Sequence, residues 1–501
     1  MKRSDFLAGP GGRLLRRPEA ALFVLALGAY AYFFQGGGWN ANVRFDLVRA
    51  LVEQRTVRID GYETNTGDLA FRDGHYYCDK APGLSLLAAP AYAVVYPLAG
   101  EGRLRGRFVS RAAWVCTVWA VALPSAVAVV MLYLLAGLLG LTPTARAGLA
   151  LAYAFGTLAF PYSTLFYGHQ LAAAALVLAF GLLALARHQR LQPGPARLAL
   201  TGVLLGSAIA VEYPSALTVA AIVLYAAAFV RPWSRWWWLA AGLSLPLLAL
   251  AAYHALAFGG PFTLPYAFST DAPRHRGPFF GIGLPTARSL YGIILSPYRG
   301  LFYSAPWLLL AAPGAVRLLR TTSLRVEAAV CVAVAGLYVA LNASLTDWHG
   351  GWSAGPRHLV PALPFLAFLA GGVATGRRLS GGERVVYGLA AAVSAVLMFV
   401  ATSVQPEVPR WYGRPFQDFL WPLFRAGQLA TNTLPIHTSA VHVRREAWNL
   451  GELAGLDGLA TLAPLAVFAA ATLTWLRATM RHEATGRARA AGEPRRVALD
   501  E

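Results

Sequence analysis

The stretch GHYYCDKAPGLSLLAAPAYAVVYPL, residues 74–98, decides how the rest of the chain is arranged. Its apolar part, residues 83–98, is shorter than the roughly 20 residues that a membrane-crossing helix needs. The segment could therefore either cross the bilayer or lie in its interface. That choice sets the side of the membrane on which every later loop lies.

The chain around this stretch has the composition of a membrane protein. Of its 501 residues, 57% are hydrophobic and 13% are charged, and the mean hydropathy is +0.49. Soluble domains carry about 25% charged residues. The net charge of +19 would suggest a nucleic-acid partner in a soluble protein, but here the arginines lie mostly between apolar runs. We therefore expect an all-α integral membrane protein with no nucleic-acid partner, in the cell (inner) membrane.

Loop charge settles the topology. If residues 83–98 do not cross, twelve arginines in short loops, such as Arg146 and Arg187, face the cytoplasm. If they do cross, these arginines move outside, whereas only the four in residues 102–111 move inside. The sequence thus predicts about 12 transmembrane helices (11–13), a juxtamembrane helix at 83–98 and cytoplasmic termini. The expected spans are 19–34, 112–138, 147–163, 170–186, 198–211, 215–230, 236–257, 300–316, 326–342, 358–375, 385–402 and 458–476.

This topology divides the chain into three parts and gathers its polar segments on one side. Residues 1–18 form a basic cytoplasmic N-terminus, 19–476 the multi-pass domain, and 477–501 a basic cytoplasmic tail. Polar groups at membrane depth are costly and usually functional, so we expect one site on the outer face. The outer segments are 35–111, 160–170, 211–214, 259–299, 346–358 and 403–457.

Lys80 is unusual in this chain. Among forty-three basic side chains only Lys2 and Lys80 are lysine. Lys80 lies just before the 83–98 helix, whose first turn begins at Pro82. An ammonium beside a helix N-terminus suits a phosphate at the level of the lipid headgroups. The plainer alternative is an amine that merely reaches the headgroups.

The first outer loop also resembles a known family. Arg44-Phe45 opens an amphipathic segment (44–54), and Tyr77, Lys80 and Pro82 form a Tyr-x-x-Lys-x-Pro pattern before the second juxtamembrane helix. This pattern is similar to that of the GT-C glycosyltransferases, in the family of protein O-mannosyltransferases and the lipid A aminoarabinose transferase. The resemblance implies transfer of a sugar from a polyprenyl-phosphate carrier to a glycan, lipid or protein acceptor. It also implies that Lys80 and Arg44 hold the carrier phosphate. The donor lipid is the expected substrate, no other cofactor is expected, and a need for a divalent metal is left open.

The general base is less obvious. The family carries an acidic residue just before the arginine-aromatic pair, where this chain has Ala41 and Asn42. Other acidic residues of the loop are therefore the candidates, Asp68 and Asp60 first and then Asp46. His169, at an outer helix end, could bind an acceptor hydroxyl or titrate near neutral pH; an ordinary interhelical hydrogen bond is equally compatible.

The segment TDWHGGWSAGPRH, residues 346–358, is the second candidate region. Its tryptophans could stack on a sugar, and its arginine could bind phosphate in bidentate fashion. An interfacial aromatic belt is the alternative. Further contacts are expected from outer helix ends. The predicted phosphate ligands are Lys80, Arg44, Arg357 and Arg299, and the predicted substrate contacts are Tyr77, Trp348, Asp347, Tyr167 and Glu212; no protein metal site is predicted.

Two other functions remain open. A transporter would place charged residues or broken helices at mid-membrane, whereas the spans of this chain are nearly free of charge. A non-catalytic accessory protein that binds lipid phosphate would fit the missing acidic residue at positions 41 and 42.

Overall fold

A computed structural model describes residues 17–99, 107–270, 278–320, 323–433 and 446–490. Within these ranges the chain is overwhelmingly helical, with two short two-stranded sheets. The predicted class, an all-α integral membrane protein, is confirmed.

Seven helical segments in the described residues are long and apolar enough to cross a membrane. Helices α3 (Pro18–Ala31), α11 (Pro195–Val211) and α12 (Ser215–Ala227) are apolar but shorter. The count of twelve crossings is therefore not confirmed. The seven segments are Phe108–Leu138, Gly168–His188, Trp233–Phe258, Arg325–Ser344, Arg357–Ala374, Gly381–Val404 and Gly458–His482.

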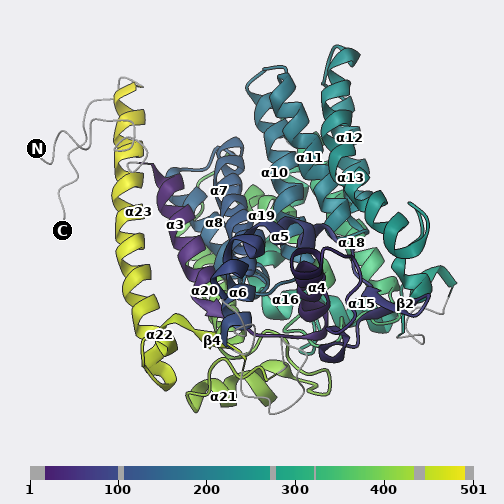
Figure 1. Cartoon of the computed structure of the whole chain (residues 1–501). Helices are drawn as coiled ribbons and strands as arrows, with labels where there is room; N and C mark the ends of the chain where they lie inside the picture. The colour runs from purple at the N-terminus through teal and green to yellow at the C-terminus, as the bar shows by residue number, and fades with distance from the viewer. Residues whose placement is uncertain (1–16, 100–106, 271–277, 321–322, 434–445, 491–501) are drawn as a thin grey trace, which may run out of the picture.

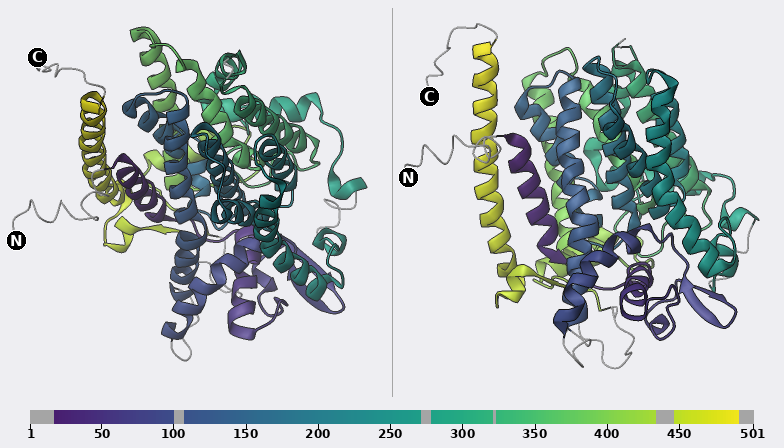
Figure 2. Two further views of the ribbon diagram at one scale, coloured as in Figure 1. Left: turned by 90° about the horizontal axis from the view of Figure 1, so that it is seen from above. Right: turned by 45° about the horizontal axis from the view of Figure 1, so that its top comes forward.

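The long helices lie side by side in a bundle, and the two ends of the bundle differ in the elements they carry (Figure 1). Helix α3 begins, and the last helix α23 (Ala463–Ala490) ends, at the same end of the bundle. Figure 2 shows that the short elements gather at the other end, which we call the loop end. These elements are α4 (Trp39–Arg49), β2 (Leu69–Arg72), β3 (His75–Cys78), α15 (Ala287–Ile294), α21 (Trp421–Arg425), β4 (Trp448–Asn449) and α22 (Leu450–Leu453).

Helix α5 (Gly83–Val95), the segment on which the topology depends, stays at the loop end. Gly83 lies against the last turn of α11, where an added Cβ would come within 2.6 Å of the Ala210 carbonyl. Farther along, the Tyr92 hydroxyl donates to Glu53 Oε1 at 2.5 Å, in the π-helical turn (Ala50–Gln54) that continues α4. One end of α5 thus contacts the last turn of α11, and the other contacts the π-helical turn after α4.

The polar side of α4 is buried rather than solvated. The amphipathic pattern of residues 44–54 places Asp46 and Arg49 on the polar face of a helix. Asp46 is fully buried and accepts from Asn65 Nδ2 at 3.1 Å. Arg49 pairs with Glu53 at 2.9 Å and lies 4.3 Å from the centre of the Tyr62 ring. The turn-rich segment after α4 folds back over this face and supplies these partners.

The loop before α4 and the loop before α22 contact each other at the loop end. Strand β1 (Phe33–Phe34) pairs antiparallel with β4. Asn432 Nδ2 donates to the carbonyl oxygens of Gln35 at 3.0 Å and Gly37 at 2.7 Å. The residues that lead into α4 are therefore fixed by segments about 400 residues later in the chain.

Candidate functional site

A cavity of about 470 Å³ lies among elements of the loop end, and its wall has two chemical parts. The apolar lining includes Leu217 of α12, Leu341 of α18 (Arg325–Ser344) and Leu345, which follows α18. The other part of the lining is polar. Its charged and titratable members are Arg44, Lys80, His169, Glu212, Asp347, Arg357 and His358. The fold thus brings six of the predicted site residues to one space.

Lys80 is held between two carboxylates. Its Nζ lies 2.9 Å from Asp79 Oδ2 and 3.2 Å from Asp68 Oδ2, and the lysine is 9% exposed. Burial disfavours the ammonium, but the two carboxylates outweigh it and raise the pKa of Lys80. Burial raises the pKa of Asp79 to about 6, against the effect of Lys80. The charge of Lys80 is therefore matched within the protein.

Arg44 is also paired and 2% exposed. One terminal nitrogen lies 2.9 Å from Glu212 Oε1, and the other donates to the Ala81 carbonyl at 2.9 Å. Its Nε donates to Asn40 Oδ1 at 3.1 Å. Each nitrogen of the guanidinium has a partner, so the side chain is held rigidly beside the cavity.

Glu212 sits against the start of α10 (Gly168–His188). A side chain on Gly168 would collide with the Glu212 carboxylate, so the glycine makes room for it. Anions are favoured at a helix N-terminus. His169 Nδ1 lies 3.5 Å from Glu212 Oε1. Burial raises the pKa of Glu212, and the neighbouring Arg44 opposes this shift.

Arg357 differs from the other two cations. It opens the 3-10 helix η9 (Arg357–Ala362) and lines the cavity, and its buried Nε has no hydrogen-bond partner among the described residues. Its guanidinium carbon lies 5.6 Å from the centre of the Tyr167 ring. Among the described cationic residues of the wall, Arg357 is thus the one with a buried guanidinium nitrogen that has no hydrogen-bond partner.

Three predicted site residues of the first loop contact other parts of the protein. Asp60 lies at the hairpin of β2 and β3, where it accepts from the Tyr76 N–H and contacts His75 Nδ1, both at 2.7 Å. Asp46 is buried under Asn65. Tyr77 packs its ring 5.6 Å from that of Phe258. None of these three lines the cavity, because each is used to hold the loop together. Asp68 does not line it either, but it contacts Lys80 there.

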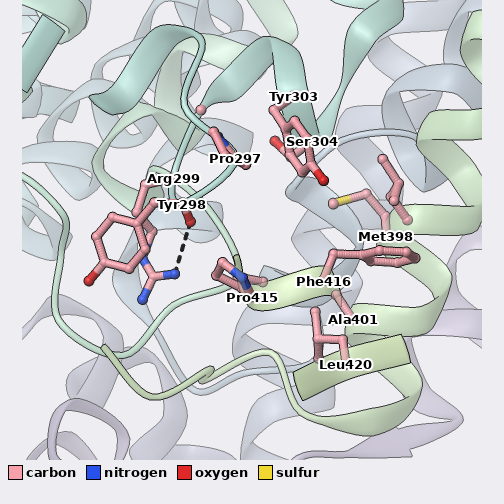
Figure 3. Close-up of a pocket in the computed structure, with 13 residues that line it drawn as sticks. Pro297, Tyr298, Arg299, Tyr303, Ser304, Met398, Ala401, Pro415, Phe416 and Leu420 are labelled. Atoms are coloured by element: carbon pink, nitrogen blue, oxygen red, sulfur yellow. Dashed lines mark hydrogen bonds between the residues drawn. The ribbon is translucent and has the colours of Figure 1, made fainter. Parts of the chain in front are cut away.

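Two further predicted residues, outside the first loop, do not line this cavity either. Trp348 packs against Gly292 of α15 and the Tyr298 ring, whose centre is 6.2 Å away. Arg299 lies beside a separate cavity of about 20 Å³, the size of one water (Figure 3). Its nitrogens donate to the carbonyl oxygens of Tyr298, Gly351 and Val408. Burial lowers the pKa of Arg299 to about 10.

The chain was compared with protein families, curated proteins and solved structures. No protein-family model and no curated protein matches the chain. The fold is similar to ArnT. The structure of ArnT from Cupriavidus metallidurans bound to undecaprenyl phosphate has 18% identity and a TM-score of 0.49, covering 96% of this chain and 79% of ArnT. The apo structure has 17% identity and a TM-score of 0.41, covering 93% and 76%. ArnT is an aminoarabinose transferase of the GT-C class, which the first-loop pattern resembles. Because both TM-scores are below 0.5, the site is interpreted from its own residues.

One residue near the site was missed by the sequence analysis. Glu407, in the loop after α20 (Gly381–Val404), is 2% exposed and accepts from the Tyr167 hydroxyl and from Asn432 Nδ2, the latter at 3.1 Å. A side chain on Gly38 would collide with its carboxylate. The sequence signal is slight: one glutamate between two prolines, in PEVP (406–409).

Proposed function

We propose that this protein is a membrane glycosyltransferase that moves a sugar from a polyprenyl-phosphate donor to an acceptor at the outer face of the cytoplasmic membrane. The observation that carries this proposal is the two-part cavity. A lipid phosphate has an anionic head and an apolar tail, and the cavity offers Arg44, Lys80 and Arg357 beside an apolar wall. We place the loop end outside and both termini in the cytoplasm, as the loop arginines indicate.

In the proposed reaction the donor phosphate binds at Arg357, with its chain along Leu217 and Leu341. An acceptor hydroxyl attacks the anomeric carbon, and the bond between that carbon and the phosphate oxygen breaks. The bonding electrons leave with the lipid phosphate, whose growing charge is stabilised by the cationic wall. The hydroxyl proton passes to a carboxylate. Asp68 remains our candidate, and it is released for this task when Lys80 turns towards the phosphate.

The test measures binding and transfer separately. Purified protein is titrated with undecaprenyl phosphate, and membranes are assayed for sugar transfer from polyprenyl-phosphate donors. Because a charge-assisted hydrogen bond contributes roughly 1.5–3 kcal/mol, Arg357→Ala should weaken binding about tenfold to a hundredfold. Lys80→Ala should abolish measurable transfer. Arg414→Ala is the matched control, since this arginine is exposed and pairs with Asp418.

Two results would contradict the proposal. Binding that is unchanged in Arg357→Ala would remove the phosphate site, and transfer that is unchanged in Lys80→Ala would remove the mechanism. Tight binding without transfer of any sugar would instead favour the non-catalytic accessory protein. That alternative draws support from the ion pairs that engage Asp68, Asp79 and Glu212 in the described structure.

A further inference from the structure

The Glu407 carboxyl is buried and contacts neutral donors, not a cation. Both oxygens accept hydrogen bonds, one from the Tyr167 hydroxyl and one from Asn432 Nδ2. Asn432 in turn holds the carbonyl oxygens of Gln35 and Gly37. The carboxyl is therefore fixed at the point where the first loop enters α4, and only a residue without a side chain fits at position 38.

Tyr167 connects this carboxyl to the cavity. The hydroxyl of Tyr167 points to Glu407, while the ring lies 5.6 Å from the guanidinium carbon of Arg357, on the cavity wall. Tyr167 is 1% exposed and cannot turn freely in its surroundings. A substitution or a change of charge at Glu407 should therefore affect Arg357 in two ways. It alters the position of the Tyr167 ring, and it alters the electrostatic interaction between the two side chains.

We propose that Glu407 is a positioning residue for the anionic ligand of Arg357: it fixes the Tyr167 ring beneath the guanidinium, and its charge sets how strongly the guanidinium attracts the anion. This inference rests on the proposed function, because the anion is the lipid phosphate of that proposal. The new element is that Glu407, which does not contact the ligand, adjusts the affinity for lipid phosphate.

The charge of Glu407 changes near neutral pH. Burial raises the pKa of Glu407 to about 7, assisted by Asp68 and opposed by Tyr167, Arg357 and Asn432. The Tyr162 hydroxyl also interacts electrostatically with the Glu407 carboxyl. Below this pKa the carboxyl is neutral and the full charge of Arg357 acts on the ligand. Above it, the carboxylate weakens that attraction, so lipid-phosphate affinity should fall as the pH rises from 6 to 8.

The experiment uses the full chain in lipid nanodiscs, with undecaprenyl phosphate as the probe at pH 6 and pH 8. The phosphate of the probe itself titrates in this range, so each affinity is divided by that of Glu407→Gln at the same pH. The ratio of the wild-type affinity to the Glu407→Gln affinity should be about fivefold lower at pH 8 than at pH 6. Glu407→Asp should keep a pH-dependent ratio, and Asp418→Asn, a charge change in the same loop, should match the wild type.

A second variant separates charge from structure. Tyr167→Phe keeps the ring but removes a donor that stabilises the carboxylate, so the midpoint of the pH dependence should move to higher pH. If the role of Glu407 were purely structural, Glu407→Gln would bind more weakly than the wild type by the same factor at both pH values. Tyr167→Phe would then leave the pH dependence of binding unchanged. If Glu407→Gln does not fold, the midpoints of the wild type and Tyr167→Phe are compared directly, because the phosphate of the probe titrates equally in both.

The outcomes distinguish the two proposals. If the wild type binds the probe but shows the same pH dependence as Glu407→Gln, the role of Glu407 is overturned and the proposed function stands. If the wild type binds no undecaprenyl phosphate at any pH, the proposed function falls, and this inference with it.

Discussion

The buried Arg44–Glu212 pair makes a prediction about single residues. The two side chains are 2% and 17% exposed and lie 2.9 Å apart. Replacing one partner of such a pair leaves the other charge buried without compensation, which costs about 3–5 kcal/mol. Glu212→Gln should therefore lower the free energy of unfolding by about 3 kcal/mol, measured as a fall in the thermal midpoint of the purified protein.

A double-mutant cycle checks the cause. The Arg44→Gln/Glu212→Gln protein removes both charges, so its loss of stability should be smaller than the sum of the two single losses. Additive losses would show that the two side chains act independently, against the contact in the structure.

Lys80 shows how far a single residue can be predicted from sequence. Its rarity and its place before a helix predict a phosphate contact, and the structure places Lys80 on the cavity wall just before α5. The sequence could not predict the two carboxylates that hold it, because Asp68 reaches it only when β2 and β3 pair. Counting acidic residues in a loop does not reveal which of them the fold brings to the same point.

At the scale of elements, the contact between α5 and α11 makes a second prediction. An added methyl group on Gly83 would meet the backbone of Ala210 and Val211, which cannot give way as a flexible side chain could. Gly83→Ala should push α5 from α11, displace Lys80 and weaken lipid-phosphate binding about tenfold, a loss of roughly 1.4 kcal/mol. The same binding titration measures the effect.

A glycine in open space provides the control. Gly148, in α8 (Pro143–Phe155), has no neighbouring atom within 4 Å of an added Cβ. Gly148→Ala should bind normally and be slightly more stable, since alanine favours a helix by about 1 kcal/mol over glycine. Equal binding by both variants would mean that the α5–α11 contact does not position the site.

Elements were predicted better than the site because their signals are local. The apolar runs locate most of the helices, and residues 83–98 form one of the shorter apolar helices. The buried face of α4 and the role of Glu407 depend on segments that return from elsewhere in the chain. Such contacts leave no periodic pattern, so reading one segment at a time does not find them.

For the whole molecule, the three native cysteines allow a clean test of orientation. Cys78, Cys116 and Cys331 are all free and buried. Trp411, in the loop end, is 66% exposed, and Leu191, in the opposite connection after α10, is 54% exposed. On intact cells a membrane-impermeant maleimide should label Trp411→Cys and should label Leu191→Cys only after the membrane is opened. The reverse pattern would place the cavity on the cytoplasmic side.

The pairing of β1 with β4 also constrains how the protein is made. A ribosome delivers Phe33 long before Trp448, so during synthesis the entrance to α4 waits without its partner strand and without Asn432. Insertion of the early helices alone cannot complete the site. The enzyme that we propose would therefore stay inactive throughout translation, and a message truncated before residue 432 would yield an inserted but incompetent product.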